Sequence, residues 1–250
     1  MLKLILVGCN GYMGRVVTAM VADDPTITII AGVDINTHQN DNYPVFACPD
    51  EVKEKADVII DFSIPASLEG LLKYTIATKT PLILCATGYS QDQLNDIENA
   101  SKQIPVFRSG NMSLGINLLA DLIKRACEVL GDDFDIEIVE RHHRRKVDAP
   151  SGTAIMLADA AAEASPNKPE YIYERESKRA PRSKNEIGIS AVRGGTIVGV
   201  HDVIFAGQDE IIELRHTAAS RDVFASGALK AAKFMQNKHP GIYNMKDILG

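Results

Sequence analysis

The chain has 250 residues and a formal net charge of −6 at pH 7, which argues against a general nucleic-acid binder, because such proteins carry a basic excess. Hydrophobic residues make up 45% and charged residues 24%, a composition that fits a globular protein with a real core and argues against a largely disordered chain. No apolar stretch approaches the ~20 residues of a membrane-spanning helix, so we expect a cytoplasmic protein without membrane contact. The four cysteines have no zinc-type spacing, and we expect them to be reduced thiols with no metal bound.

The first half of the chain alternates between two periodicities. Compact apolar runs rich in Val and Ile predict buried strands at residues 2–7, 26–33, 56–62, 81–86 and 104–107. Apolar residues at helical spacing predict helices between them, at residues 15–22, 65–77 and 91–101. Strand and helix alternate throughout, and this order predicts an α/β domain built on a doubly wound parallel sheet.

After Asn111 the pattern changes. Helical spacing predicts helices at residues 116–130, 154–163 and 226–236, and alternation predicts a strand at 134–140. Three further segments alternate like antiparallel strands, at residues 187–193, 199–205 and 210–217. The segment 165–185 is polar and contains prolines, so we expect an exposed, mobile loop. This part predicts an α+β domain with a mostly antiparallel sheet.

Three glycines follow the first predicted strand, in the run Gly8-Cys-Asn-Gly-Tyr-Met-Gly14. Their spacing, G-x-x-G-x-x-G, is a variant of the pattern that brings a helix N-terminus to a pyrophosphate. Glycines also close ordinary turns, so the triplet alone is weak. Here a strand precedes it and a helix follows, and Asp34 comes about 20 residues later, where a carboxylate holds ribose hydroxyls. The combination favours a Rossmann-type dinucleotide site.

The most unusual stretch is E-R-H-H-R-R-K-V-D-A-P-S-G-T-A, residues 140–154. A solvated basic patch, a nucleic-acid contact and a metal site on the adjacent histidines are all conceivable, but neighbours on a strand point to opposite faces and no third ligand is nearby. Ser151 or Thr153 can cap a helix that begins near Ala154, and Gly152 exposes backbone amides. A cationic loop leading into a helix N-terminus favours a site for a small carboxylated substrate.

This stretch resembles the signature E-x-H-H-x-x-K-x-D-A-P-S-G-T-A of dihydrodipicolinate reductases. The resemblance covers nearly the whole chain. Residues 8–14 are similar to the family's cofactor loop, 61–65 to its D-F-T/S-x-P segment and 109–117 to its A-x-N-F-S-x-G-V-N segment. Residues 193–225 follow its C-terminal pattern. The family fold implies a Rossmann domain of residues 1–112 completed by 223–250, and a substrate-binding and oligomerisation domain of residues 113–222.

Site roles carry over from the resemblance. His142 matches the proton donor and Lys146 the second catalytic donor, while His143, Gly152 and Thr153 match the contacts to a substrate carboxylate. The positions that match the cofactor contacts are Gly8, Cys9, Asn10, Gly11, Tyr12, Met13, Asp34, Cys85, Ala86, Thr87, Ser109, Gly110, Asn111 and Met112. No metal is implied.

The implied reaction is NADH- or NADPH-dependent reduction of 4-hydroxy-tetrahydrodipicolinate, a small dicarboxylate, in the diaminopimelate route to lysine. Water is lost first, hydride adds in conjugate fashion to the unsaturated imine, and the enamine takes a proton to give tetrahydrodipicolinate. Family members are typically homotetramers, so a homotetramer is expected here.

Two departures from the family pattern concern the cofactor. Cys85-Ala86 replaces the usual Gly-Thr, which affects side-chain contacts to the nicotinamide. Tyr12 stands where many members have Arg, and together with Asp34 it predicts that NADH is preferred.

Two alternatives remain at this point. One is a different Rossmann oxidoreductase of small amino or imino acids. The other is a non-enzymatic dinucleotide sensor that binds nucleic acid through residues 141–146.

Overall fold

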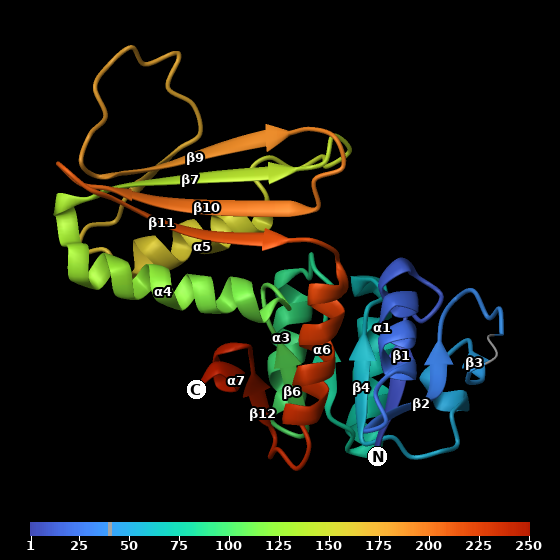
Figure 1. The fold of residues 1–250 in the computed structure, drawn as a ribbon. Helices are drawn as coiled ribbons and strands as arrows, with labels where there is room; N and C mark the ends of the chain where they lie inside the picture. The colour runs from blue at the N-terminus through green and yellow to red at the C-terminus, as the bar shows by residue number, and fades with distance from the viewer. Residues whose placement is uncertain (40–41) are drawn as a thin grey trace. The chain divides into compact units, whose positions relative to one another are not determined.

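The structure, a computed structural model, describes residues 1–39 and 42–250, which form two compact units (Figure 1). Unit 1 comprises Met1–Ser113 and Asp222–Gly250, and unit 2 comprises Leu114–Arg221. Among the described helices, none is long and apolar enough to cross a membrane.

Unit 1 is built on a parallel sheet with the strand order β12-β6-β5-β4-β1-β2-β3. The strands are β1 (Leu2–Val7), β2 (Ile27–Val33), β3 (Val45–Phe46), β4 (Val58–Asp61), β5 (Leu82–Leu84), β6 (Pro105–Arg108) and β12 (Gly241–Tyr243). The central strands are buried on both faces, because helices cover both sides of the sheet, and this explains their unbroken apolar runs. The predicted doubly wound sheet is confirmed. The edge strands β3 and β12 were not predicted, because neither lies in an apolar run as long as those of the central strands.

The helices of unit 1 are α1 (Tyr12–Ala22), α2 (Leu68–Thr78), α3 (Gln91–Ser101), α6 (Asp222–Phe234) and α7 (Lys246–Leu249), with 3₁₀ turns η1 (Pro49–Glu51) and η2 (Pro65–Ser67). Helix α1 packs beside α6, and α2 beside α3. The predicted bounds of α3 agree with the structure because its start has a capping box, in which Ser90 accepts from the amide of Gln93 and Gln93 reaches back to the amide of Ser90.

Unit 2 is built on a mixed sheet with the strand order β11-β10-β7-β9-β8. Its strands are β7 (Asp135–His142), β8 (Glu170–Ile172), β9 (Glu186–Arg193), β10 (Gly199–Ala206) and β11 (Ile211–Ala218). Strand β10 runs antiparallel to β7 and β11 over long registers, as expected. Strand β9 instead pairs in parallel with β7 and β8, so the expectation for residues 187–193 was wrong in direction. The alternation of apolar and polar residues along a strand does not show whether the strand pairs in parallel or antiparallel fashion. The connection from β7 to β9, which includes α5, is long enough for a parallel pairing.

Helices α4 (Leu114–Leu130) and α5 (Gly152–Ala164) cover one face of this sheet, and the 3₁₀ turn η3 (Gly131–Asp133) follows α4 (Figure 1). The side chains that alternate inward from β7, β9 and β10 form the core with the two helices. The other face of the sheet carries the outward residues of the same strands.

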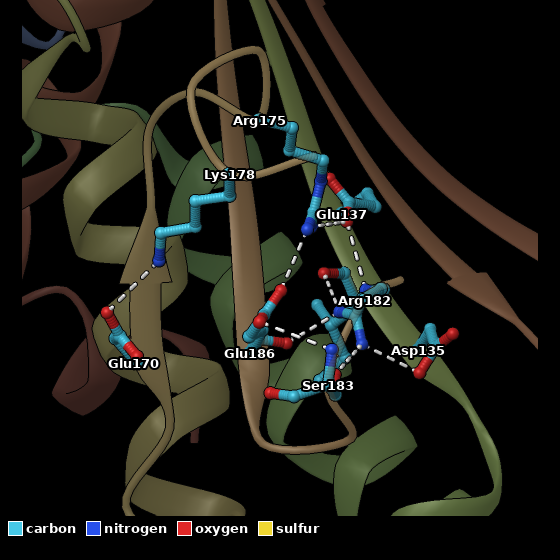
Figure 2. A network of polar contacts seen from close by, with 9 residues as sticks. Asp135, Glu137, Glu170, Arg175, Lys178, Arg182, Ser183 and Glu186 are labelled. Atoms are coloured by element: carbon cyan, nitrogen blue, oxygen red, sulfur yellow. Dashed lines mark hydrogen bonds and ion pairs between the residues drawn. The ribbon is translucent and has the colours of Figure 1, made fainter. Parts of the chain in front are cut away.

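The segment 165–185 is not a loop throughout, because β8 lies within it at the sheet edge. Arg182 anchors the end of the segment to the sheet, as Figure 2 shows. Its guanidinium donates to Asp135 at 2.7 Å and Glu137 at 3.1 Å, and to the backbone oxygens of Ile136 and Glu186. These contacts fasten a polar segment that contributes little apolar surface to the core.

Candidate active site

Along β7, the side chains on the core-facing side of the unit 2 sheet change from apolar to titratable. Ile136 and Ile138 are buried against the helices, and Glu140 and His142 continue the same parity and are buried too. On the neighbouring strand β10, His201 lies opposite Glu140, and His216 on β11 lies opposite His201. The sheet therefore presents a row of polar side chains at the end of its core face.

Glu140 is at the centre of this polar row and has no exposed surface. Both terminal nitrogens of Arg193 donate to its carboxylate at 2.7 Å, one to each oxygen. The backbone amide of Ser151 donates at 3.0 Å, and Nδ1 of His142 lies 2.7 Å from Oε2. Burial by itself would raise the pKa of Glu140, but the hydrogen bonds from Arg193 and His142 outweigh it and lower the pKa. The carboxylate is therefore ionised at neutral pH.

The ring of His142 lies edge-on to the ring of His201, with centroids 5.2 Å apart. Nε2 of His201 is 3.1 Å from the hydroxyl of Ser151. Burial, and then the proximity of His142, lower the pKa of His201 to about 4, so this neighbour is neutral at pH 7. His142 thus sits between an ionised carboxylate and a neutral imidazole.

Helix α5 begins beside these groups, at Gly152. The hydroxyl of Ser151 accepts from the amide of Ala154 at 3.2 Å, which confirms a serine cap predicted from the sequence. A Cβ added at Gly152 would meet no described atom within 4 Å. The first turn of α5 is therefore open to a ligand on this side and carries the partial positive charge of a helix N-terminus.

The basic side chains of residues 141–146 do not form one cluster. Arg141 turns to the opposite face of the sheet and pairs with the buried Asp202, which also pairs with Arg215. Arg144 and Arg145 are exposed. Arg141 therefore does not belong to the cationic loop that the sequence predicts beside the helix N-terminus, because the alternation of β7 sends its side chain outward.

Lys146 and His143 lie closer to the polar row. The ammonium of Lys146 is 2.9 Å from the carboxylate of Asp148. His143 is half-buried, and burial followed by the charge of Arg145 lowers its pKa. Both residues belong to the segment that connects the end of β7 at His142 to the start of α5 at Gly152.

The glycine loop of unit 1 lies at the carboxyl end of β1. Gly8 has φ +76°, and a Cβ there would lie 2.8 Å from the backbone of Phe62. A Cβ at Gly14 would lie 2.2 Å from the carbonyl oxygen of Gly8. Both positions therefore require glycine. Helix α1 begins at Tyr12, and no side chain of the described residues caps it. Such a loop and helix start fit a dinucleotide pyrophosphate.

Asp34 follows β2 at the same edge of the sheet. Its two carboxylate oxygens accept from the amides of Asn10 at 3.0 Å and Asn36 at 2.9 Å. The side chain of Asn10 donates to the backbone oxygens of Asn36 and His38, at 2.6 and 2.9 Å. The glycine loop and the turn after β2 are thus tied together around one carboxylate, an arrangement that fits a ribose.

The other predicted cofactor positions follow β5 and β6 at this carboxyl edge. Residues 85–87 come directly after β5, and residues 109–112 after β6, where Asn111 and Met112 are buried. Burial of the Cys85 thiol, and then the charge of Asp61, raise its pKa well above the usual value, so the thiol is neutral. The parallel sheet brings all the predicted cofactor positions to one edge.

Comparison with known proteins identifies the family. The family model described as dihydrodipicolinate reductase, N-terminus, matches residues 2–112, and the one described as dihydrodipicolinate reductase, C-terminus, matches residues 115–249. The chain belongs to the dihydrodipicolinate reductase family. It is therefore an oxidoreductase of that family, and the resemblance found in the sequence is confirmed.

Relatives named 4-hydroxy-tetrahydrodipicolinate reductase match the full length of the chain. Those of Caldanaerobacter subterraneus subsp. tengcongensis and Clostridium tetani are each 53% identical over 249 residues, which is 100% of this chain and 98% and 97% of theirs. A solved structure, the dipicolinate-bound dihydrodipicolinate reductase from Paenisporosarcina sp. TG-14, matches with a TM-score of 0.83 at 23% identity over 99% of both chains. It shares the fold.

Membership of the dihydrodipicolinate reductase family weighs against both alternatives. A different Rossmann oxidoreductase would share the N-terminal half, and a nucleic-acid-binding sensor would need a DNA-reading module, but the family models match both halves of the chain.

Sequence reasoning assigned no role to several residues that the structure places at the centre of the polar row. They are Glu140, Arg193, His201 and His216. The parity of β7 could have identified the first of them, because a strand that buries Ile136 and Ile138 also buries Glu140.

Proposed function

We propose that this chain reduces 4-hydroxy-tetrahydrodipicolinate to tetrahydrodipicolinate with NADH or NADPH, in the diaminopimelate route to lysine. The observation that carries the proposal is the buried Glu140–His142 pair beside the open start of α5. The names of relatives that are 53% identical over the full chain support the same substrate.

Unit 1 binds the nucleotide in this proposal. The residues that would hold it are those of the glycine loop, Asp34 and the segments after β5 and β6. The loop would contact the pyrophosphate through backbone amides, and Asp34 would accept from the ribose hydroxyls. When bound, the reduced nicotinamide supplies hydride. Because Asp34 and Tyr12 disfavour a 2′-phosphate, NADH is the preferred cofactor.

Unit 2 binds the dicarboxylate substrate. The amides of Gly152 and Thr153 at the start of α5 would donate to one carboxylate, with His143 beside them. Lys146 is held by Asp148 in an ion pair at the protein surface, in which the carboxylate side chain is 58% exposed, and surface pairs contribute only ~0–1 kcal/mol. A substrate carboxylate or the developing charge on the ring nitrogen can therefore recruit the Lys146 ammonium at little cost. The dipicolinate bound to the Paenisporosarcina protein is a planar ligand of the same class.

His142 supplies the proton in the final step. The residue is 9% exposed, and its Nδ1 lies 2.7 Å from the ionised carboxylate of Glu140, which holds the ring in place. A histidine is suited to the task because its unperturbed pKa of ~6.5 lies near neutrality.

The test is the turnover of two variants with the aldol product of pyruvate and aspartate semialdehyde. His142→Gln and Lys146→Met should each lower kcat by about 10²–10⁴-fold, the usual range for removal of a positioned proton donor. The dissociation constant of NADH should barely change, because neither residue lies in the glycine loop. An Arg144→Met variant, which removes an exposed cation of the same turn, is the control. Near-normal turnover in both active-site variants would disprove the assignment.

We also propose a homotetramer that forms through the outer face of the five-stranded sheet. Apolar side chains remain exposed there, among them Ile211 at 66% and Val192 at 44%. Light scattering after gel filtration should give four times the mass of one chain. An Ile211→Glu variant should give smaller species, and a monomeric wild type would contradict the proposal.

A further inference from the structure

The carboxylate of Glu140 is surrounded by hydrogen-bond donors, of which some can only donate and one can also accept. At Oε1 the donors are Arg193 and the backbone amide of Ser151, and at Oε2 they are Arg193 and the ring of His142. A guanidinium and a backbone amide can only donate. The imidazole is the one group around this carboxylate that can change from donor to acceptor, by moving its proton between its two nitrogens.

An ionised carboxylate accepts hydrogen bonds and cannot donate, so the ring must present an N–H at Nδ1. The second nitrogen, Nε2, then carries the exchangeable proton. We propose that Glu140 is a positioning residue that fixes the tautomer of His142, so that Nε2 is the atom that delivers the proton to the substrate. This inference rests on the proposed role of His142 as the proton donor.

The space beside Nε2 is kept open by a second residue, Gly199. It is the first residue of β10, next to the pair Val200–Arg141, and a Cβ added there would come 3.2 Å from Nε2 of His142 and 3.5 Å from its Cδ2. Its φ is not in the left-handed region, so the backbone alone does not require glycine. A side chain at this position would therefore crowd Nε2.

The proton step then balances. The Nε2–H bond of the imidazolium breaks, and its electron pair stays on Nε2. The π pair of the enamine C=C bond, in the anion left by hydride addition, forms the new C–H bond, and the electron pair on the ring nitrogen forms the C=N bond of tetrahydrodipicolinate. His142 is left neutral with Nδ1–H still donated to Glu140. Reprotonation from solvent at Nε2 restores the donor without any change at Glu140.

A Glu140→Gln variant tests this directly, because the carboxamide has only one acceptor. If its NH₂ group lay at the Oε1 position, it would face two groups that can only donate. At the Oε2 position the NH₂ group faces the guanidinium of Arg193, which can only donate, and Nδ1 of His142, which can become an acceptor. The amide therefore takes the second orientation and donates to Nδ1. The tautomer of His142 switches, and its remaining proton moves to Nε2.

The tautomer is read from the ¹⁵N shifts of histidine-labelled protein, at a pH where the ring is neutral and without substrate or nucleotide. Wild type should show His142 as the Nδ1–H form, and Glu140→Gln as the Nε2–H form, with kcat lowered by about 10- to 100-fold or more. Glu137→Gln is the matched control, because Glu137 is an arginine-bonded carboxylate on the other face of the same strand. It should change neither readout.

A wild-type ring in the Nε2–H form, or a Glu140→Gln variant with the turnover of Glu137→Gln, would overturn the inference. If Glu140→Gln does not fold, the tautomer of His142 in wild type and the turnover of Gly199→Ala still test the inference. That variant leaves Glu140 and its donors unsubstituted and should lower kcat about tenfold or more, whereas Gly70→Ala, where a Cβ meets nothing within 4 Å, should not. Normal turnover of His142→Gln, together with a wild-type ring in the Nδ1–H form, would instead mean that His142 is not the proton donor of the proposed reaction.

Discussion

Replacement of Asp34 by alanine should change which nucleotide the enzyme prefers. In wild type a 2′-phosphate would lie beside the Asp34 carboxylate. At a separation of ~4–5 Å and an effective dielectric constant of ~20, the repulsion is about 3–4 kcal/mol per unit charge before screening. Each of the two cations nearest in sequence already has a partner, and the partner of Arg15 lies in the glycine loop itself. Arg15 donates to the backbone oxygen of Asn10 at 2.8 Å, and Lys3, near the start of β1, is 2.8 Å from Glu54.

We therefore expect wild type to use NADH more efficiently than NADPH, and Asp34→Ala to shift the ratio of kcat/KM towards NADPH by about tenfold or more. The variant also removes an acceptor from the amides of Asn10 and Asn36, so KM should rise for both nucleotides, and the ratio is the informative readout. Asp23→Ala, at an exposed position after α1, is the control. A wild-type preference for NADPH above tenfold, or an unchanged ratio in Asp34→Ala, would refute the reasoning.

Two further predictions concern unit 2. First, 2,6-pyridinedicarboxylate should inhibit competitively with the substrate, because it is planar and offers the same pair of carboxylates to the start of α5; no inhibition at millimolar concentration, or competition with nucleotide only, would contradict the site. Second, His201 has its pKa lowered by burial to about 4 in the folded chain, against ~6.5 when unfolded, so the unfolded chain binds more protons and stability falls as pH drops through this window. The loss at His201 between pH 7 and pH 5 should be about 2 kcal/mol of unfolding free energy. Denaturant titrations should show a weaker pH dependence in His201→Asn, and an unchanged one would exclude this origin.

The parts of the fold that the sequence predicts are those where one local signal is strong. The glycine loop is one, because Gly8 and Gly14 admit no side chain. The start of α5 is another, because Ser151 caps it. The direction of β9 could not be predicted, because strand alternation is the same in parallel and antiparallel pairings.

The sequence singled out part of the candidate site but not the contacts that build it. His142 was predicted from the sequence as a catalytic residue. Glu140, which holds it, was included in the sequence motif but was given no role. Arg193 comes from a strand more than fifty residues away, and only the parallel pairing of β9 with β7 brings it to Glu140. The opposite orientation of Arg141 follows from strand parity, which a count of basic residues ignores.

The measurement that tests the central claim most directly is a reductase assay of the wild-type chain. The aldol product of pyruvate and aspartate semialdehyde is generated in the cuvette, NADH oxidation is followed by absorbance, and the product is identified by NMR. We predict NADH consumption that requires both the substrate and the chain and yields tetrahydrodipicolinate in equal amount. No oxidation of either NADH or NADPH at millimolar substrate, by a folded preparation of the chain, would contradict the account.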